Sequence, residues 1–390
     1  MLLLPAPALA HARVVSLDPA PGAVLTVPPQ LIRIEFSEPV TPFARGVDVY
    51  APDGRRVSGT AIPQGAALVV GLGDYSGSPE GTYLVVWRVV AQDTHPSRGS
   101  YTFSVGHAGP VPAGDLAGGD LGAVSPAGLL LQALARWLHF VGFALSFGVL
   151  AFLLVVLREL EPPAGLRRLV YLGIALLLAA EPIALVAQAA SLGSVDSPSL
   201  ADVLGSAFGR ALGLRLAAPL LLWGILGIPA EARGKGTWSV LVLGALLAGV
   251  DGLSGHTILG LPPAAGVLLT AVHVASMVVW VGCLVALLAV VGTAPDRRAL
   301  VGRFGRLAAA SVALLILSGG LLALVHLKAP GDLLFSAYGL TLAIKLLVVA
   351  VALWLAWTGL RALRSERPEL LVLAGVLALA ALLASLPPPR

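Results

Sequence analysis

The pattern of apolar and polar positions changes once along this chain, near residue 128. Before it, short segments such as Leu31–Phe36 alternate apolar and polar residues with the period of two that is typical of a half-buried strand. Turn residues such as Pro52-Asp53-Gly54 separate these segments. About seven short strands within residues 11–106, with no helical periodicity, predict an all-β sandwich.

Beyond that point the apolar runs are long enough to cross a bilayer. A Gly-, Pro- and Ala-rich stretch, residues 107–126, reads as a flexible linker between the two parts. Residues 127–390 then predict an all-α polytopic membrane bundle of about eight transmembrane helices. The expected spans lie near 127–157, 168–191, 211–229, 237–254, 264–292, 304–327, 337–360 and 369–386.

The composition agrees with a membrane protein. Hydrophobic residues make up 57% of the 390 positions and charged residues 12%, so lipid must solvate most of the chain. The net charge of +4 does not indicate a nucleic-acid partner, because the basic residues are spread over short loops between apolar runs. The single cysteine, Cys283, lies inside an apolar run, where we expect it to serve as a small packing residue.

The loop charges predict the orientation. The loops after the first, third, fifth and seventh spans hold twelve basic residues, and the opposite loops with the C-terminal tail hold three. The positive-inside rule then places the β-domain and the C-terminus outside the cytoplasmic membrane. Residues 1–10 end in Ala8-Leu9-Ala10, a pattern that signal peptidase favours, although this segment is short and lacks a basic leading region. Cleavage after Ala10 would make His11 the new N-terminus.

The soluble part contains one candidate metal site. Asp93 and His95 stand two residues apart in an extended segment, so both side chains can reach one ion. An N-terminal His11 would add its amine and its imidazole. Nitrogen donors with one carboxylate oxygen suit copper(II) in a tetragonal arrangement. The alternative is that Asp93 caps a turn and His95 is simply exposed.

Residues 11–105 resemble the CopC copper-binding proteins throughout. The shared features are His11-Ala12, the segments 18–23 and 36–40, Trp87-Arg88-Val89-Val90, Asp93-Thr94-His95-Pro96 and the segment 99–103. The resemblance implies an Ig-like or cupredoxin-like sandwich with copper(II) bound by His11, Asp93 and His95. Some members also have a methionine-rich copper(I) site, but this domain has no methionine, so we expect that site to be absent.

Polar residues inside the expected spans are costly and therefore informative. Two stripes at helical spacing stand out, namely Gln132, Arg136, His139 and Ser146 in the first span, and Thr270, His273, Met277 and Trp280 in the fifth. At 1.5 Å per residue, His139 lies about 18 Å and His273 about 14 Å from the outer end of its span. The two imidazoles could share a metal ion or line one path; alternatively, each bonds a neighbouring helix.

Four further residues in the membrane part are candidates. His256 and His326 stand at the outer ends of the fourth and sixth spans, either as first binding sites for an ion or as ordinary interfacial histidines. Glu181 and Lys345 are intramembrane charges of opposite sign. We expect them to form a structural ion pair, the alternative being a role in proton coupling.

The membrane part is similar to the CopD proteins. The shared features are Arg303-Phe304 through Ser318-Gly319, Ala337-Tyr338-Gly339-Leu340 with Lys345, Ser254-Gly255-His256, and His273 with Trp280-Val281-Gly282. Where the family usually has a double glycine after that tryptophan, this chain has Gly282-Cys283. Fusions of CopC with CopD are associated with copper uptake, which implies a transporter and not an enzyme. The resemblance does not define the ligands within the membrane.

The leading hypothesis is therefore a copper importer in the cytoplasmic membrane. Copper(II) is captured at His11, Asp93 and His95, and passes His256, His139 and His273, with Met277 and His326 as further pathway candidates. No nucleotide-binding motif points to ATP as the energy source. A periplasmic copper chaperone or reductase is a candidate partner besides the ions and the bilayer.

Two alternatives to an importer remain. One is a redox protein that binds haem or a quinone at His139 and His273, and the other is a copper sensor or buffer that transports nothing.

Overall fold

In the computed structural model the chain divides into two compact units. One comprises residues 1–129 with 185–210, and the other comprises residues 130–184 with 211–390. The residues that it describes are Ala12, 14–73, 80–91, 96–112, 126–159, 162–192, 197–228, 238–254, 262–327, 329, 331–362 and 368–386. Residues 1–10, the expected signal peptide, lie outside these ranges, as does most of the expected linker.

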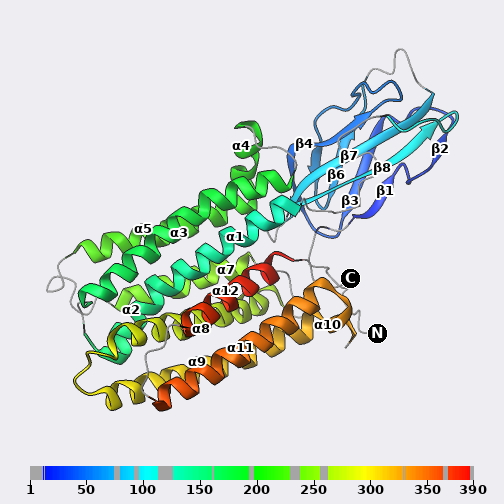
Figure 1. Cartoon of the computed structure of the whole chain (residues 1–390). Coiled ribbons are helices and arrows are strands. Elements are labelled where there is room, and N and C mark those ends of the chain that lie inside the picture. Colours follow the sequence, from blue (N-terminus) through cyan, green and yellow to red (C-terminus); the bar gives the residue numbers. More distant parts are fainter. Residues whose placement is uncertain are drawn as a thin grey trace, which may run out of the picture. The chain divides into compact units, whose positions relative to one another are not determined.

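The first unit holds a β-sandwich built from two sheets (Figure 1). One sheet has the order β1 (Val14–Asp18), β3 (Leu31–Phe36), β6 (Ala67–Gly71) and β5 (Ile62–Gln64). The other has the order β2 (Val24–Leu25), β8 (Pro96–Val105), β7 (Gly81–Ala91) and β4 (Val40–Tyr50). The described pairs are antiparallel except for β2 with β8, which is parallel. The predicted sandwich is confirmed.

The core of the sandwich follows the alternation read from the sequence. Ile32, Ile34 and Phe36 on β3 are buried, and the residues between them are only partly covered. Trp87 on β7 is also buried, and its cross-strand neighbour on β8 is Gly99. A Cβ atom at Gly99 would overlap the indole ring of Trp87. Glycine at this position therefore makes room for the largest buried side chain of the domain.

A short helix, α4 (Ser197–Gly205), packs against β4 within the same unit. The Asp202 carboxylate accepts a hydrogen bond from the backbone N–H of Ala44 at 2.7 Å. Ala44 has a positive φ of 55° and lies where the pairing of β4 with β7 shifts register, between Pro42 and Val47. The carboxylate thus satisfies a backbone donor that the interrupted ladder does not use.

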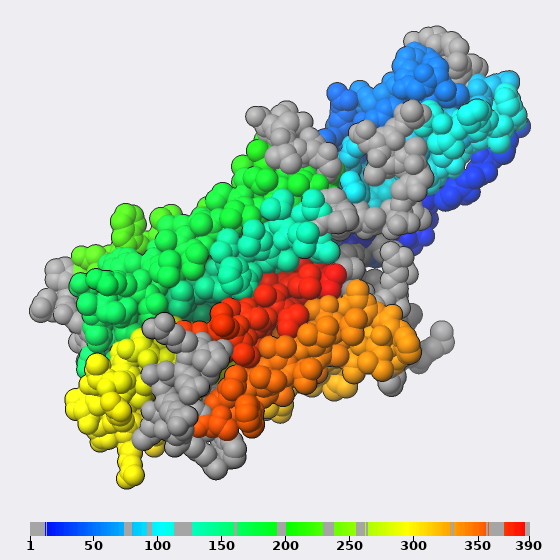
Figure 2. Space-filling model, in the orientation of Figure 1, coloured from blue at the N-terminus to red at the C-terminus, as the bar shows by residue number. Residues whose placement is uncertain are grey.

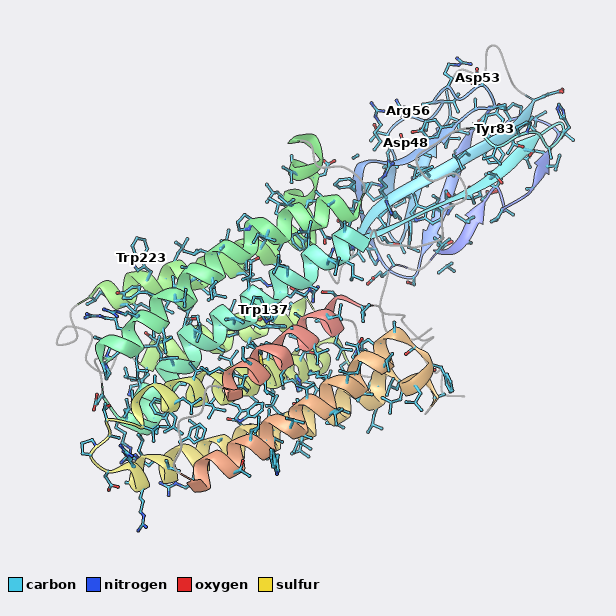
Figure 3. The ribbon with its side chains drawn as sticks, in the orientation of Figure 1. Asp48, Asp53, Arg56, Tyr83, Trp137 and Trp223 are labelled. Carbon is cyan, nitrogen blue, oxygen red and sulfur yellow. The ribbon has the colours of Figure 1, made fainter. Side chains whose placement is uncertain are left out.

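Figure 3 shows Asp48 and Arg56 on this domain; their side chains form an ion pair at 3.6 Å.

The second unit is a helical bundle. Its first long helix runs as α1 (Pro126–Phe143), a π-helical turn η1 (Ala144–Gly148), α2 (Val149–Ala151) and a second π-helical segment η2 (Phe152–Leu157). The later helices are α3 (Ala164–Ser191), α5 (Ala207–Gly227), α7 (Ser239–Leu253), α8 (Pro263–Val290), α9 (Arg297–His326), α10 (Asp332–Phe335), α11 (Ala337–Ala362) and α12 (Pro368–Ser385).

The expected number of spans is approximate. Among the described residues, six helices are long and apolar enough to cross a membrane, and they correspond to the first, second, third, fifth, sixth and seventh expected spans. Two shorter apolar helices, Ser239–Leu253 and Leu370–Ser385, stand at the positions of the fourth and eighth. Hydropathy alone does not distinguish a short buried helix from a full span, because both are continuously apolar.

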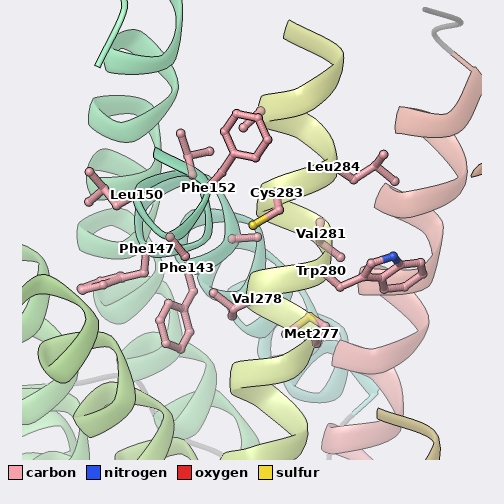
Figure 4. Close-up of a cluster of buried hydrophobic side chains, with 14 of the residues drawn as sticks. Phe143, Phe147, Leu150, Phe152, Met277, Val278, Trp280, Val281, Cys283 and Leu284 are labelled. Carbon is pink, nitrogen blue, oxygen red and sulfur yellow. The ribbon is translucent and has the colours of Figure 1, made fainter. Parts of the chain in front are cut away.

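The bundle core is formed where the first long helix packs against α8 (Figure 4). Cβ atoms at Gly148 or Gly282 would overlap the backbone of the opposite helix, so the two glycines allow close approach, as small residues do in membrane bundles. Cys283 is buried here, with its thiol 3.6 Å from the carbonyl oxygen of Gly148. It occupies the packing position that the sequence predicts.

The outer surface of the bundle is apolar. Large side chains such as Leu317, Leu324 and Leu347 are more than half exposed, and in Figure 3 Trp223 points away from the helices. Figure 2 shows α12, in red, beside α11, in orange, on one face of the bundle. Apolar side chains that face outward along helices of spanning length are solvated by lipid.

Substituting alanine for Gly99 will destabilise the sandwich, because the added methyl group must displace the Trp87 ring or the backbone of β8. Overpacking of this kind costs about 1–3 kcal/mol of unfolding free energy. Peptide-resolved hydrogen exchange of the full-length protein will show faster exchange in β7 and β8. Gly71→Ala is the control, because no atom lies within 4 Å of a Cβ built there. Equal exchange in the two variants would contradict the packing role of Gly99.

Candidate functional site

The predicted copper(II) ligands His11, Asp93 and His95 lie outside the described residues. The strands that flank them are well defined. Val14, at the start of β1, pairs with Phe36, and Val40, four residues further along the chain, pairs with Ala91 at the end of β7. The segment that holds Asp93 and His95 leaves from Ala91 and returns at Pro96. The described positions that flank the predicted ligands, Val14, Ala91 and Pro96, therefore lie at the same end of the sandwich.

The charges near this end are mixed. Glu38 lies in the connection between β3 and β4, which belongs to the same end. Further along the hairpin, Arg88 and Arg98 face each other across β7 and β8, and Arg88 forms an ion pair with Asp48 at 3.2 Å. Burial, with the neighbouring charge of Arg88, lowers the pKa of the Arg98 guanidinium from its ordinary value. The Asp48 carboxylate partly balances the charge of Arg88 through this ion pair.

The membrane unit contains a buried cluster of charged side chains that we call the His139 network: His139 on α1, Glu181 on α3, Arg215 on α5 and Asp251 on α7. The Nδ1 atom of His139 lies 3.1 Å from Oε1 of Glu181, and its Nε2 atom lies 3.1 Å from Oδ2 of Asp251. Arg215 donates through Nε to Oδ1 of Asp251 at 3.0 Å. His139, Glu181 and Asp251 are each at most 8% exposed.

Hydrogen-bond chemistry limits the charge states of this network. A neutral imidazole has one donor and one acceptor nitrogen, so it cannot donate to two carboxylates at once. If both carboxylates are ionised, His139 must be an imidazolium. The network then has two positive and two negative groups, which is the balance that buried charges require. The second oxygen of Glu181, Oε2, is buried and has no hydrogen-bond partner among the described residues.

This arrangement differs from two expectations. Both ring nitrogens of His139 are engaged by carboxylates and point in opposite directions, so in this structure neither presents a lone pair to a metal ion. Glu181 forms its ion pair with His139 and not with Lys345. The physical reason is that a buried charged group pairs with the oppositely charged group on the helix packed beside it, which for Glu181 is His139 on α1. Within the described part of the chain, no group of three or more His, Cys, Asp or Glu residues is arranged to hold a metal ion.

His273 has a different environment. Its Nδ1 atom lies 3.0 Å from Oγ of Ser318 on α9. The Ser318 hydroxyl donates to the carbonyl oxygen of Leu314, so Ser318 accepts the hydrogen bond and Nδ1 of His273 carries the proton. The lone pair therefore lies on Nε2, the state in which a histidine can bind a metal. A Cβ atom at Gly319 would lie 2.9 Å from the imidazole Cε1 atom, so glycine leaves room for the ring.

Two more candidates lie on the same elements. His326, at the end of α9, donates from Nδ1 to the carbonyl oxygen of Leu322 at 2.6 Å and stacks on Tyr338. It follows Gly319 by seven residues, which is two helical turns or about 10 Å along the same face of α9. Met277 follows His273 by one turn on α8 and is buried.

The remaining candidates lie elsewhere. His256 lies outside the described residues. Lys345, on α11, is half-buried.

Sequence reasoning missed Arg215, Asp251 and Ser318. A signal for the first two was present, because each is the single charged residue in its expected span, residues 211–229 and 237–254. Intramembrane charges mark functional or structural polar sites. Ser318 stands in a segment that resembles the CopD proteins, but its residue type indicated no role, since serine is common in membrane helices and usually bonds its own helix.

Two families match the chain. Residues 14–106 match the CopC domain, and residues 125–262 match the copper resistance protein D-like N-terminal domain. The copper transport protein CutJ of Bacillus subtilis is 28% identical over 365 residues, which is 88% of this chain. This chain spans 66% of the length of that relative.

Shorter relatives cover the β-domain. Copper resistance protein C of Pseudomonas syringae pv. tomato is 40% identical over 114 residues, 27% of this chain and 87% of its own length. Protein YobA of Escherichia coli K12 is 37% identical over 100 residues, 25% of this chain and 79% of its own length. The crystal structure of CopC from Methylosinus trichosporium OB3b is 24% identical and covers 27% of this chain and 99% of its own, with a TM-score of 0.22. The chain therefore belongs to the copper-handling family in which a CopC domain is joined to a CopD-like membrane domain.

Proposed function

We propose that this protein takes up copper across the cytoplasmic membrane. The β-domain lies outside and captures copper(II) through the amine and imidazole of His11, the carboxylate of Asp93 and the imidazole of His95. The helical bundle then carries copper inward. The protein acts as a transporter and not as an enzyme, and a periplasmic chaperone or reductase is the soluble partner that this route would need.

The observation that carries the proposal is the state of His273 in a family that joins a copper-handling domain to a membrane bundle. Ser318 holds the proton of His273 on Nδ1, so Nε2 has the lone pair that a copper ion needs. Met277, one turn further along α8, adds a soft thioether, which suits copper(I). Membrane helices that needed only to pack would gain nothing from a histidine in this state.

The proposed route follows the contact between α8 and α9. His326 stands two turns from Gly319 on α9, so an ion would pass from His326 to His273 and then to Met277. His256 is a further candidate at the outer end. The route leaves out His139, whose nitrogens both bond carboxylates. The same contacts weigh against a haem held between His139 and His273, because an axial ligand needs a nitrogen lone pair.

Replacing His95 with alanine will weaken copper(II) capture without disturbing the membrane part. One of the predicted nitrogen donors is lost, so we expect the copper(II) affinity of the full-length protein to fall at least about tenfold, or about 1.4 kcal/mol. Competition with a chelator of known affinity measures the change. His107→Ala is the matched control, because His107 lies next to Glu80 at the opposite end of β7 and β8. Equal losses in the two variants would contradict the site.

Replacing His273 with alanine will abolish copper uptake while leaving copper(II) capture intact. Ser318→Ala keeps the imidazole but no longer fixes its tautomer, so we expect a reduction of about 10-fold to 100-fold, as is usual for groups that orient a metal ligand. Uptake is measured in proteoliposomes. Ser385→Ala is the control, because its buried hydroxyl bonds only the carbonyl of Ala381 in the described contacts of α12. Uptake that is unchanged in His273→Ala would favour a copper buffer or sensor over a transporter.

A further inference from the structure

The His139 network contains two carboxylates in unequal environments. Asp251 accepts bonds at both oxygens, from Arg215 at 3.0 Å and from His139 at 3.1 Å. Glu181 accepts at Oε1 from His139, while its Oε2 is buried and bonds nothing in the part of the chain that the structure describes. Two cations hold Asp251 in its ionised form. Glu181 has one cationic partner, and no described group bonds its Oε2 in the apolar interior, so this oxygen is the position in the network where a proton can bind.

We propose that Glu181 is a proton-exchange site within the bundle and that the passage of copper depends on its protonation state. Oε2 takes up the proton, which converts the carboxylate into a neutral carboxylic acid while Oε1 keeps its bond to His139. The network is neutral when Glu181 is ionised, since His139 and Arg215 balance Glu181 and Asp251. It carries one positive charge when Glu181 is protonated.

The link to copper is electrostatic and rests on the proposed transport function. In the low-dielectric interior of the bundle, a net positive charge disfavours a second cation. Asp251 lies on α7, which packs against α8, the helix that carries His273 and Met277. A proton on Glu181 and a copper ion in the bundle therefore disfavour each other. By linkage, the effect of each on the other is equal.

The other ionisable groups of the packed helices do not replace Glu181 in this role. On α1, Arg136 adds a positive charge one turn before His139 and has contacts of its own. On α5, Arg210 is exposed. On α8, His273 bonds Ser318 and the Cys283 thiol contacts the carbonyl oxygen of Gly148. Among the described residues of the packed helices, the carboxylate with a buried oxygen that accepts no hydrogen bond is Glu181.

The proton site is tested first without copper. Infrared spectroscopy of the full-length protein in liposomes will show the band of a protonated carboxyl group that grows as the pH falls. The band will be missing in Glu181→Gln and present in Ser146→Ala, whose buried hydroxyl bonds carbonyl oxygens of its own helix. Glu181→Asp keeps a carboxyl group and will restore a band with a shifted pH midpoint. A band of unchanged intensity in Glu181→Gln would overturn the assignment.

The coupling is tested by copper uptake into proteoliposomes across a range of pH. Glutamine mimics the neutral acid but keeps the size of the side chain, so uptake by Glu181→Gln should stay at the low rate of the protonated protein. We expect Ser146→Ala to take up copper at least about fivefold faster than Glu181→Gln at neutral pH, and the two to converge in acid. Loss of copper from the β-domain in acid is common to both variants, so it cancels in the comparison.

The outcomes separate the two proposals. If Glu181→Gln and Ser146→Ala have the same pH profile of uptake, the coupling is wrong, whereas copper import stands. If the unaltered protein takes up no copper but shows the carboxyl band that Glu181→Gln lacks, the proton site stands, and both the importer function and the coupling fail.

Discussion

The constraint on which the bundle depends is that lipid offers no partner to a charged or polar group. Arg215 and Asp251 lie within the apolar stretches of α5 and α7, and each stabilises the other there at hydrogen-bond distance. His139 extends the pair to Glu181, so one set of bonds joins α1, α3, α5 and α7. In a membrane protein such bonds determine which helices become neighbours, because apolar packing alone discriminates weakly between one leucine-rich face and another.

Close backbone contact between the first long helix and α8 is the second interaction that holds the bundle together. Gly148 and Gly282 allow the first long helix and α8 to touch along their main chains. The first helix changes to a π-helical turn at Ala144–Gly148, just where this contact occurs. A π-turn shifts the side chains that follow it relative to those before it. His139 can therefore face α3 and α7, while the later residues of the same helix face α8 and its cysteine.

The fold was more predictable from sequence than the membrane site, for a physical reason. Strand alternation, turn residues and long apolar runs are local features, so residues 31–36 or 264–290 indicate their structure without knowledge of any partner. The partner of Glu181 is a property of which helices are neighbours. Lys345 was the opposite charge that stood out in the sequence, but His139 is the group that α1 places beside Glu181. The fourth and eighth expected spans coincide with the shorter apolar helices for a similar reason, since continuous apolarity does not reveal the length of a helix.

His139 and His273 differ in the hydrogen-bond acceptor that faces the imidazole ring, and this acceptor determines whether the ring keeps a lone pair. A carbonyl or a serine oxygen fixes the proton of an imidazole on one nitrogen and leaves the lone pair on the other; this is the arrangement at His273 and the basis for assigning it to copper. Carboxylates on both sides instead favour the doubly protonated ring, which repels a metal ion but stabilises the negative charges beside it. Residue type and depth, which are all that a sequence provides, make His139 and His273 look equivalent. Their hydrogen-bond partners leave a lone pair on the ring of His273 and make His139 a counter-ion, and the proposed movement of a cation through lipid would need both.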